Sequence, residues 1–179
     1  MRRKASLELT TIRKELKDDE GQIRQVNIRA FSQSAEAEVV DALRIACPEG
    51  VSLVAICEGK VVGHILFTPV VIETKKKKIW GMGLAPMSVL PEFQRQGIGT
   101  KLVQAGLAEL SKTRQPFIIV LGHPEYYPRF GFVRASLYGI VSQWKGVPDE
   151  AFMILVLDEA ELKDASGVGR YRAEFDTAM

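Results

Sequence analysis

The sequence predicts an α/β fold in which helices cover both faces of a mixed β-sheet. Its segments follow one another as a strand, two early helices, three strands, a helix, a strand, a short helix and further strands. One of these helices is plainly amphipathic and begins at a pair of glycines after an apolar strand. The composition, 46% hydrophobic and 26% charged over 179 residues, suits a single globular domain spanning residues 1–179.

The first 50 residues predict one strand and two helices. Loosely alternating apolar residues predict a strand within 7–16, and the acidic run at 18–20 precedes a helix that reaches Ala30. Ser34 is a suitable N-cap for the second helix, which ends at the Cys-Pro-Glu-Gly segment 47–50.

Three strands follow, at Val51–Cys57, 61–72 and 79–90. The turn between the second and third strand holds four consecutive lysines, 75–78. Such a run raises the possibility of nucleic-acid binding. We favour a solvated hairpin tip, because no aromatic residues are interleaved with the lysines and acidic residues lie nearby.

The remaining chain predicts a helix at 98–112, a buried strand at Phe117–Leu121, a short helix from 123 to 130, and strands that start at 131 and 152. Residues 158–179 form a charged tail that starts as a helix, so the predicted core spans 7–157.

The start of the helix at 98 has the features of an anion site. Gly97 and Gly99 carry no Cβ, the first turn lacks acidic residues, and Arg95 and Lys101 flank it. Unpaired N–H groups at a helix N-terminus bind phosphate readily. The spacing of the glycines differs from that of a dinucleotide fingerprint or a Walker A loop.

Two motifs resemble the GNAT acetyltransferases. The segment Gln94-Arg95-Gln96-Gly97-Ile98-Gly99 resembles the family's Gln/Arg-x-x-Gly-x-Gly/Ala signature, and the strand 87–91 before it is similar to the pantetheine-binding strand. The segment Tyr127-Pro128-Arg129-Phe130-Gly131-Phe132 resembles the family's Tyr-x-x-x-Gly-Phe motif, and the longer segment 121–132 is similar to the YhbS-like branch. The resemblance covers about 7–157. It implies a mostly antiparallel central sheet of about six to seven strands.

The resemblance also implies a function, an N-acetyltransferase that moves the acetyl group of acetyl-CoA to an amine by direct attack on the thioester. The backbone N–H of Met87 or Val89 would bind the acetyl oxygen. No metal is implied. The residues implied in cofactor binding are Met87, Ser88 and Val89 for the pantetheine, and Gln94, Arg95, Gln96, Gly97, Ile98, Gly99 and Thr100 for the pyrophosphate.

For catalysis, the resemblance implies that Tyr127 protonates the departing CoA sulfur. The base stays open among His123, which titrates in the useful range, Glu36 or Glu38 in the early helix, and a water chain. We predict that His64 is a satisfied core histidine. One departure is Val120, at a position where many family members have a cofactor-contacting Asn, so that contact is not implied.

The alternative to an enzyme is a non-catalytic acetyl-CoA-binding regulatory or interaction module. A net charge of +2 gives no whole-protein reason to expect nucleic acid or membrane as a partner, and no apolar run is long enough to span a bilayer. No apolar segment follows the basic start, so we predict no signal peptide. Two cysteines, expected to be reduced, favour a cytoplasmic location. The acceptor, small molecule or protein, stays open, as do the acyl length and the choice between monomer and homodimer.

Overall fold

The computed structural model describes residues 10–178, which pack as two compact units. Unit 1 contains the described residues up to Phe67 together with Pro86–Glu109, and unit 2 contains Thr68–Ala85 and Leu110–Thr177. Two long strands, β3 (Lys60–Thr74) and β4 (Lys78–Val89), each contribute residues to both units. Hydrogen bonding along the sheet follows the order β1-β2-β3-β4-β5-β8-β6, and β9 pairs with both β3 and β7.

The elements of unit 1 match their predicted positions closely. Besides parts of β3 and β4, this unit contains β1 (Thr11–Lys14), α2 (Glu20–Phe31), α3 (Ala35–Ala46), β2 (Val51–Cys57) and all but the last residue of α4 (Ile98–Leu110). Residues 7–9 of the predicted first strand lie outside the described residues. The helix predicted to start at 98 is confirmed, and it ends two residues earlier than predicted.

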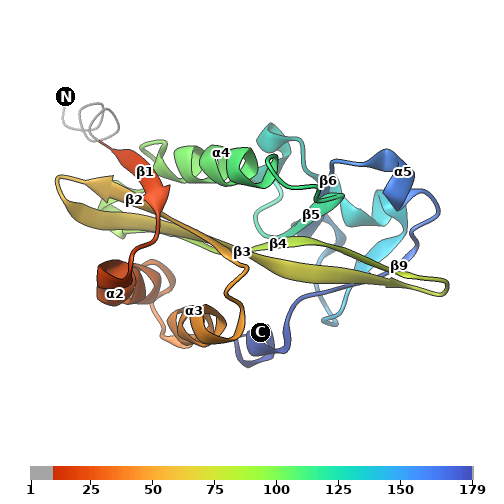
Figure 1. Ribbon diagram of the computed structural model, residues 1–179, viewed down its shortest axis with the longest axis horizontal. Coiled ribbons are helices and arrows are strands. Elements are labelled where there is room, and N and C mark those ends of the chain that lie inside the picture. The colour runs from red at the N-terminus through yellow and green to blue at the C-terminus, as the bar shows by residue number, and fades with distance from the viewer. Residues whose placement is uncertain (1–9, 179) are drawn as a thin grey trace. The chain divides into compact units, whose positions relative to one another are not determined.

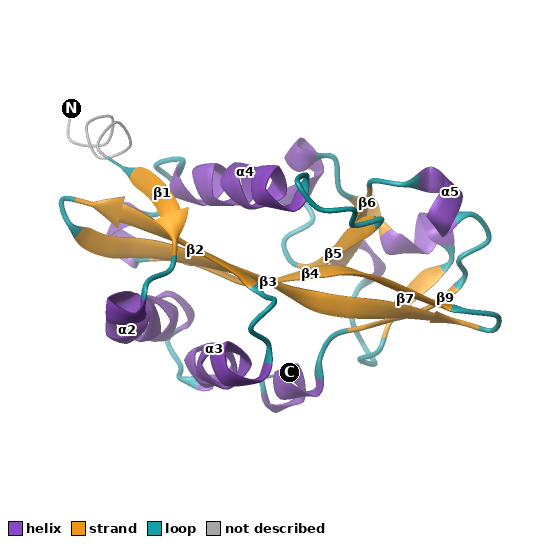
Figure 2. Cartoon of the chain, viewed as in Figure 1, coloured by secondary structure: helices purple, strands orange, loops and turns teal. Residues whose placement is uncertain are grey.

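Helices cover both sides of the strands in unit 1 (Figure 1, Figure 2). On one side α4 packs very closely on β3: a Cβ placed at Gly106 would lie 2.2 Å from the Phe67 ring, and one at Gly63 would lie 3.0 Å from Leu102. On the other side, Asn27 of α2 contacts His64 of β3. Because side chains alternate along a strand, Gly63 and Phe67 face α4 while His64 faces the other helices.

One predicted cap is wrong. Ser34 does stand at the N-cap position of α3, but its side chain makes no capping hydrogen bond. The Ser34 hydroxyl donates instead to the Glu38 carboxylate at 2.7 Å. A capping residue usually has extended backbone angles, which bring its side-chain oxygen to the N–H groups of the first turn, whereas Ser34 has φ of −92° and ψ of −15°, in the helical region.

Unit 2 contains the shorter strands. They are β5 (Phe117–Leu121), β6 (Val133–Arg134), β7 (Ile140–Ser142), β8 (Phe152–Val156) and β9 (Gly167–Arg170), with α5 at Glu159–Leu162. The pairs β4–β5 and β7–β9 are parallel, whereas β1–β2, β2–β3, β3–β9, β5–β8 and β6–β8 are antiparallel. The predicted mixed and mostly antiparallel sheet is therefore confirmed. Over the described residues it has nine strands when the shortest ones are included.

Residues 158–179, predicted as a charged tail, contribute to the sheet. Asp158 begins α5 by accepting hydrogen bonds from the N–H groups of Ala160 and Glu161, at 3.0 and 3.3 Å. The chain then forms β9, which pairs with residues 71–74 of β3. The helical start of this segment is confirmed, and the strand that follows it was not predicted.

The short helix predicted from 123 is wrong in its start and its type. The structure has a turn at 124–126 and then a single 3₁₀ turn, Tyr127–Phe130. Pro128 has no N–H and so cannot donate to residue 124, which removes the bond that an α-helix beginning at Pro124 requires. Gly131, with φ of 92°, ends the turn in the left-handed region.

The lysine run lies at an exposed hairpin tip, as predicted. The Thr74 hydroxyl shapes the tip by accepting from the N–H groups of Lys76 and Lys77, at 3.1 and 2.9 Å. Lys77 also approaches the Glu161 carboxylate at 3.5 Å, and Lys78 approaches Glu73 at 3.2 Å. Part of the local positive charge is therefore balanced within the chain.

Candidate active site

The loop between β4 and α4 turns the chain with two left-handed residues. After β4 a 3₁₀ turn, Pro91–Phe93, leads to Arg95 with φ of 56° and Gly97 with φ of 88°. The value at Gly97 costs a glycine little, whereas Arg95 is a non-glycine residue in an unfavourable region. Backbone strain of this kind concentrates at functional sites.

The N-terminus of α4 presents unpaired donors beyond this loop. The first bond of the helical ladder runs from the N–H of Lys101 to the carbonyl of Gly97, at 3.1 Å, so the N–H groups of residues 98–100 precede the ladder. The first turn contains no acidic residue. Ile98 is 1% exposed, so its side chain anchors the helix in the core while its backbone faces the loop.

Two of the predicted cofactor residues, Gln94 and Gln96, stabilise this loop through side-chain hydrogen bonds. Gln94 Nε2 donates to the carbonyl of Val89 at 3.0 Å, and Gln96 Nε2 donates to the carbonyl of Glu92 at 2.8 Å. Glu92 in turn accepts two hydrogen bonds from Arg29 of α2, both at 3.1 Å. The loop is thereby tied back to β4 and across to α2, which holds its backbone donors in place.

The end of β4 holds the other predicted cofactor residues, 87–89. The N–H of Leu90 donates to the carbonyl of Val62 in β3 at 2.9 Å. Because N–H groups alternate along a strand, those of Met87 and Val89 point to the opposite edge. The pairing of β4 with β5 spans residues 82–84 and stops before that point. Ser88 is 2% exposed, and its hydroxyl finds no hydrogen-bond partner within residues 10–178.

Tyr127, in unit 2, is a buried tyrosine held by its ring. It packs edge-on against Tyr126 and Phe132, with ring centroids 5.1 and 5.7 Å apart, and a Cβ at Gly122 would lie 2.3 Å from it. Burial raises the pKa of the Tyr127 hydroxyl well above its ordinary value, and Tyr126 adds to the shift. The group therefore stays protonated at neutral pH, as a proton donor must.

The side chain of each candidate base is either exposed or hydrogen-bonded to a residue nearby in the sequence. The side chain of His123 is exposed, and its carbonyl accepts from the N–H of Tyr126 at 3.0 Å. Glu36 accepts from Gln33 at 2.9 Å, and Glu38 accepts from Ser34. These contacts are typical of a helix start, so the structure adds no argument for either glutamate as the base.

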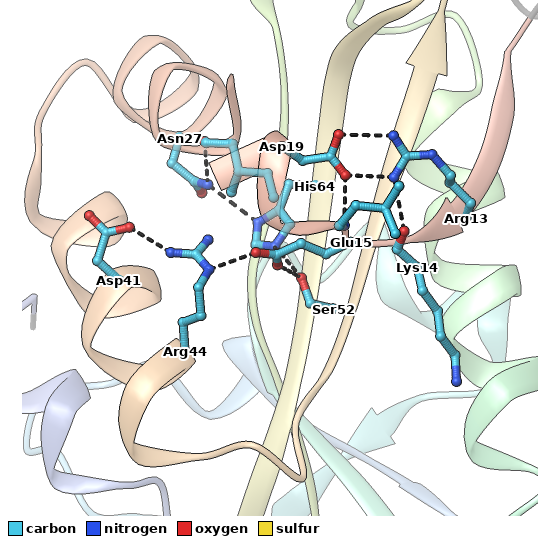
Figure 3. Close-up of polar contacts among 11 residues, drawn as sticks. Arg13, Lys14, Glu15, Asp19, Asn27, Asp41, Arg44, Ser52 and His64 are labelled. Atoms are coloured by element: carbon cyan, nitrogen blue, oxygen red, sulfur yellow. Dashed lines mark hydrogen bonds and ion pairs between the residues drawn. The ribbon is translucent and has the colours of Figure 1, made fainter. Parts of the chain in front are cut away.

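Sequence reasoning missed a polar cluster in unit 1 that is buried at Asn27 and His64 and partly buried at its other members (Figure 3). We call it the Glu15 cluster, and its members are Glu15, Asn27, Arg44, Ser52 and His64. Arg44 Nε donates to Glu15 at 2.6 Å, and the Ser52 hydroxyl donates to the other oxygen of the same carboxylate. His64, fully buried and in contact with Ser52 and Asn27, is the satisfied core histidine that the sequence predicts.

The protonation state of His64 follows from its neighbours. The Asn27 amide nitrogen approaches Nδ1 at 3.3 Å and can only donate, so Nδ1 accepts and the proton lies on Nε2. Nε2 then donates to the Ser52 hydroxyl at 2.9 Å. Burial, together with the positive charge of Arg44, lowers the pKa of His64 from 6.5 to about 3. The ring is therefore neutral, and the serine proton is directed to Glu15.

Two further kinds of feature are absent from the described part of the chain. Within residues 10–178, no group of three or more His, Cys, Asp or Glu side chains is arranged to hold a metal ion. Over the same residues, every helix is too short or too polar to cross a bilayer.

Comparison with known families and proteins identifies relatives along most of the chain. The family model described as "Acetyltransferase (GNAT) domain" matches residues 11–135. YjhQ of Escherichia coli K12, described as an N-acetyltransferase, is 42% identical over 119 residues, which is 65% of this chain and 65% of YjhQ. YhbS of the same strain, described in the same way, is 32% identical over 166 residues, which is 92% of this chain and 98% of YhbS.

Solved structures agree with these matches. YhbS from Escherichia coli, crystallised in complex with CoA, superposes with a TM-score of 0.84 at 30% identity, covering 93% of this chain and 92% of YhbS. A GNAT family acetyltransferase from Brucella melitensis, in complex with acetyl-CoA, gives a TM-score of 0.73 at 38% identity over 93% of this chain and 98% of its own. The chain therefore belongs to the GNAT acetyltransferase family, as a relative of YhbS.

Proposed function

We propose that this protein transfers the acetyl group of acetyl-CoA to an amine of a small molecule or protein. The observation that carries the proposal is the loop before α4, in which left-handed Arg95 and Gly97 lead to three backbone donors without an acid beside them. Its relatives were crystallised with CoA and acetyl-CoA. A pyrophosphate would bind the backbone N–H groups of residues 97–100, with Arg95 adding charge.

Each step of the proposed reaction would depend on different residues. The free edge of β4 at Met87 and Val89 would pair with the pantetheine, and one of these N–H groups would stabilise the charge on the acetyl oxygen. As the amine nitrogen bonds to the carbonyl carbon and the carbon–sulfur bond breaks, Tyr127 would give its proton to the sulfur. The amine first loses a proton, either to His123 or to a chain of waters leading to solvent.

A direct test measures free CoA thiol released from acetyl-CoA across a panel of amines. We expect release that depends on both acetyl-CoA and one class of amine. The rival function is a non-catalytic acetyl-CoA-binding module, which keeps the same loop and predicts binding without release. Reproducible turnover on any acceptor would exclude that rival, and tight acetyl-CoA binding with no turnover on a broad panel would favour it.

Gly99 gives a second test, because stability and binding should change in opposite directions. Gly99 lies in the first turn of α4, where alanine is favoured over glycine by up to about 1 kcal/mol. The Gly99→Ala variant should therefore unfold at an equal or higher temperature. It should also bind CoA about ten-fold more weakly, because the new Cβ obstructs the close approach of phosphate to the backbone.

The matched control is Gln104→Ala, an exposed position on the same helix. It also improves helix propensity and should leave the dissociation constant of CoA unchanged. If Gly99→Ala binds CoA as tightly as the native protein, the helix start does not hold the pyrophosphate.

A cytoplasmic location stays a prediction. Both cysteines, Cys47 and Cys57, are buried thiols, as expected for a chain that folds in a reducing compartment. The choice between monomer and homodimer stays open as well.

A further inference from the structure

Unit 1 contains a cavity of about 440 Å³ that the cofactor loop does not use. It lies between the connection from β1 to α2, the helix α3 and the start of β2. Its volume falls in the range of small-molecule sites, about 300–1,000 Å³. Most of the wall is apolar, from Leu16, Val40, Leu43, Val51 and Leu66.

The partly buried polar part of the wall comes from the Glu15 cluster. Glu15, Arg44 and Ser52 line the cavity, and the side chains of Glu15 and Arg44 are 13% and 22% exposed. Hydrogen bonds along the cluster run in one direction, from His64 to Ser52 and from Ser52 to Glu15. The chain of donors therefore ends on a carboxylate, which can only accept.

Two of the three guanidinium nitrogens of Arg44 are occupied in the same way. Nε donates to Glu15 at 2.6 Å, and Nη1 donates to Asp41 at 2.8 Å. The third nitrogen, Nη2, is buried and has no hydrogen-bond partner within residues 10–178, and Figure 3 shows it pointing toward Asn27, which does not line the cavity. Within the Glu15 cluster, then, the cavity meets a fixed acceptor and no unused donor directed at it.

The charged residues that line the cavity are Lys14, Lys17 and Arg44 against Glu15 and Glu20, and Arg44 is itself paired with Glu15 and Asp41. The Lys14 ammonium lies 3.6 Å from Glu109 of α4, on the opposite side of the strands from α3. Lys17 and Glu20 stand three residues apart at the rim and have opposite charges. A ligand carboxylate would face Glu15 at close range, whereas a hydrogen-bond donor with a positive charge would be attracted to it.

We propose that this cavity binds a small aliphatic amine in its ammonium form, with the nitrogen donating to Glu15 and the hydrocarbon part against Leu43 and Val51. An amine is the class of molecule that the proposed reaction consumes. That the bound amine is the acetyl acceptor rests on the proposed function, but the binding itself does not.

The experiment titrates the protein, with and without CoA, with n-pentylammonium chloride and separately with sodium pentanoate, and follows backbone amide shifts by NMR. The two probes have similar hydrocarbon chains and opposite charges. We expect n-pentylammonium to shift the amides of Leu16 and Ser52 saturably, and pentanoate to bind at least about ten-fold more weakly. Equal binding of the two probes, or no binding of the amine, would overturn the proposal.

Two carboxylate variants separate ligand contact from structural support. Glu15→Gln and Asp41→Asn each remove a charged partner of Arg44, but only Glu15 lines the cavity. Glu15→Gln should weaken amine binding about ten-fold or more, while Asp41→Asn should change it less than about three-fold. Equal losses in the two variants would mean that the network only supports the fold, and the proposal would fail.

A third variant remains informative if Glu15→Gln is unstable. Leu16 lines the cavity and is 58% exposed, so Leu16→Arg should fold and place a positive charge at its mouth. It should weaken n-pentylammonium and strengthen pentanoate. The opposite order would contradict the proposal.

The result is independent of catalysis. The Tyr127→Phe variant should bind the amine like the native protein, so a failure of acetyl transfer and a failure of amine binding are separate outcomes. If n-pentylamine is also acetylated, and Glu15→Gln raises its KM, the cavity is the acceptor site. If the amine binds at Glu15 and is not acetylated, the cavity is a second amine site, and the proposal still holds.

Discussion

Replacing Tyr127 with phenylalanine should lower kcat by about 100-fold and leave the dissociation constant of CoA within about three-fold of the native value. The variant keeps the ring that packs against Tyr126 and Phe132 and removes only the hydroxyl. Because burial keeps that hydroxyl protonated, its loss removes a ready proton donor and little packing. Steady-state kinetics and calorimetric CoA titration measure the two quantities.

The matched control is Tyr126→Phe, which deletes a hydroxyl from the adjacent residue. It should leave kcat within about three-fold of the native value. Solvent-isotope or burst kinetics should first establish that chemistry limits the rate. Unchanged turnover of Tyr127→Phe under those conditions would remove the residue from the mechanism, since product release could not mask the loss.

The second large effect concerns acid stability. The folded-state pKa of His64, about 3, lies below its ordinary value of 6.5, so the unfolded chain takes up the proton first as the pH falls. The stabilisation from His64 is complete above pH 6.5 and is lost as the pH drops toward 3. Over that window it amounts to roughly 4–5 kcal/mol in the free energy of unfolding.

Urea unfolding at several pH values, in the native protein and in His64→Gln, measures this contribution. Glutamine offers one acceptor and one donor, as the neutral ring does toward Asn27 and Ser52, but it takes up no proton in this range. Acid-sensitive pairs elsewhere, such as Arg13 with Asp19, affect both proteins alike and cancel in the difference. Parallel pH curves for the two proteins would show that His64 does not titrate as its surroundings imply.

Local signals predicted most of the fold. The strand Phe117–Leu121 is a continuous apolar run between polar residues, and the structure places it at the same bounds. The strand β9, Gly167–Arg170, has two glycines and one valine, so no apolar pattern marks it. It forms because its backbone reaches β3, a strand about a hundred residues earlier. A short stretch of sequence carries no signal for pairing between two strands so far apart in the chain.

The same distinction separates the parts of the candidate site that the sequence could and could not indicate. The loop at Gly97 is visible because its glycines, cations and missing acids are neighbours in sequence. The Glu15 cluster is not visible, because Arg44 and Ser52 lie 29 and 37 positions from Glu15. Each member has an ordinary sequence context, and only the packing of α3 against the strands brings them together.

The close packing of Gly106 against Phe67 has a consequence for the cofactor loop. Residue 106 lies eight positions after Ile98, about 12 Å along the axis of α4. A side chain there would push the C-terminal part of α4 away from β3. Because the helix is rigid, its N-terminus would shift as well. The donors at residues 98–100 would then move relative to β4 without any change in the loop. Glycine at 106 thus fixes the position of the proposed pyrophosphate site, which lies about two turns away.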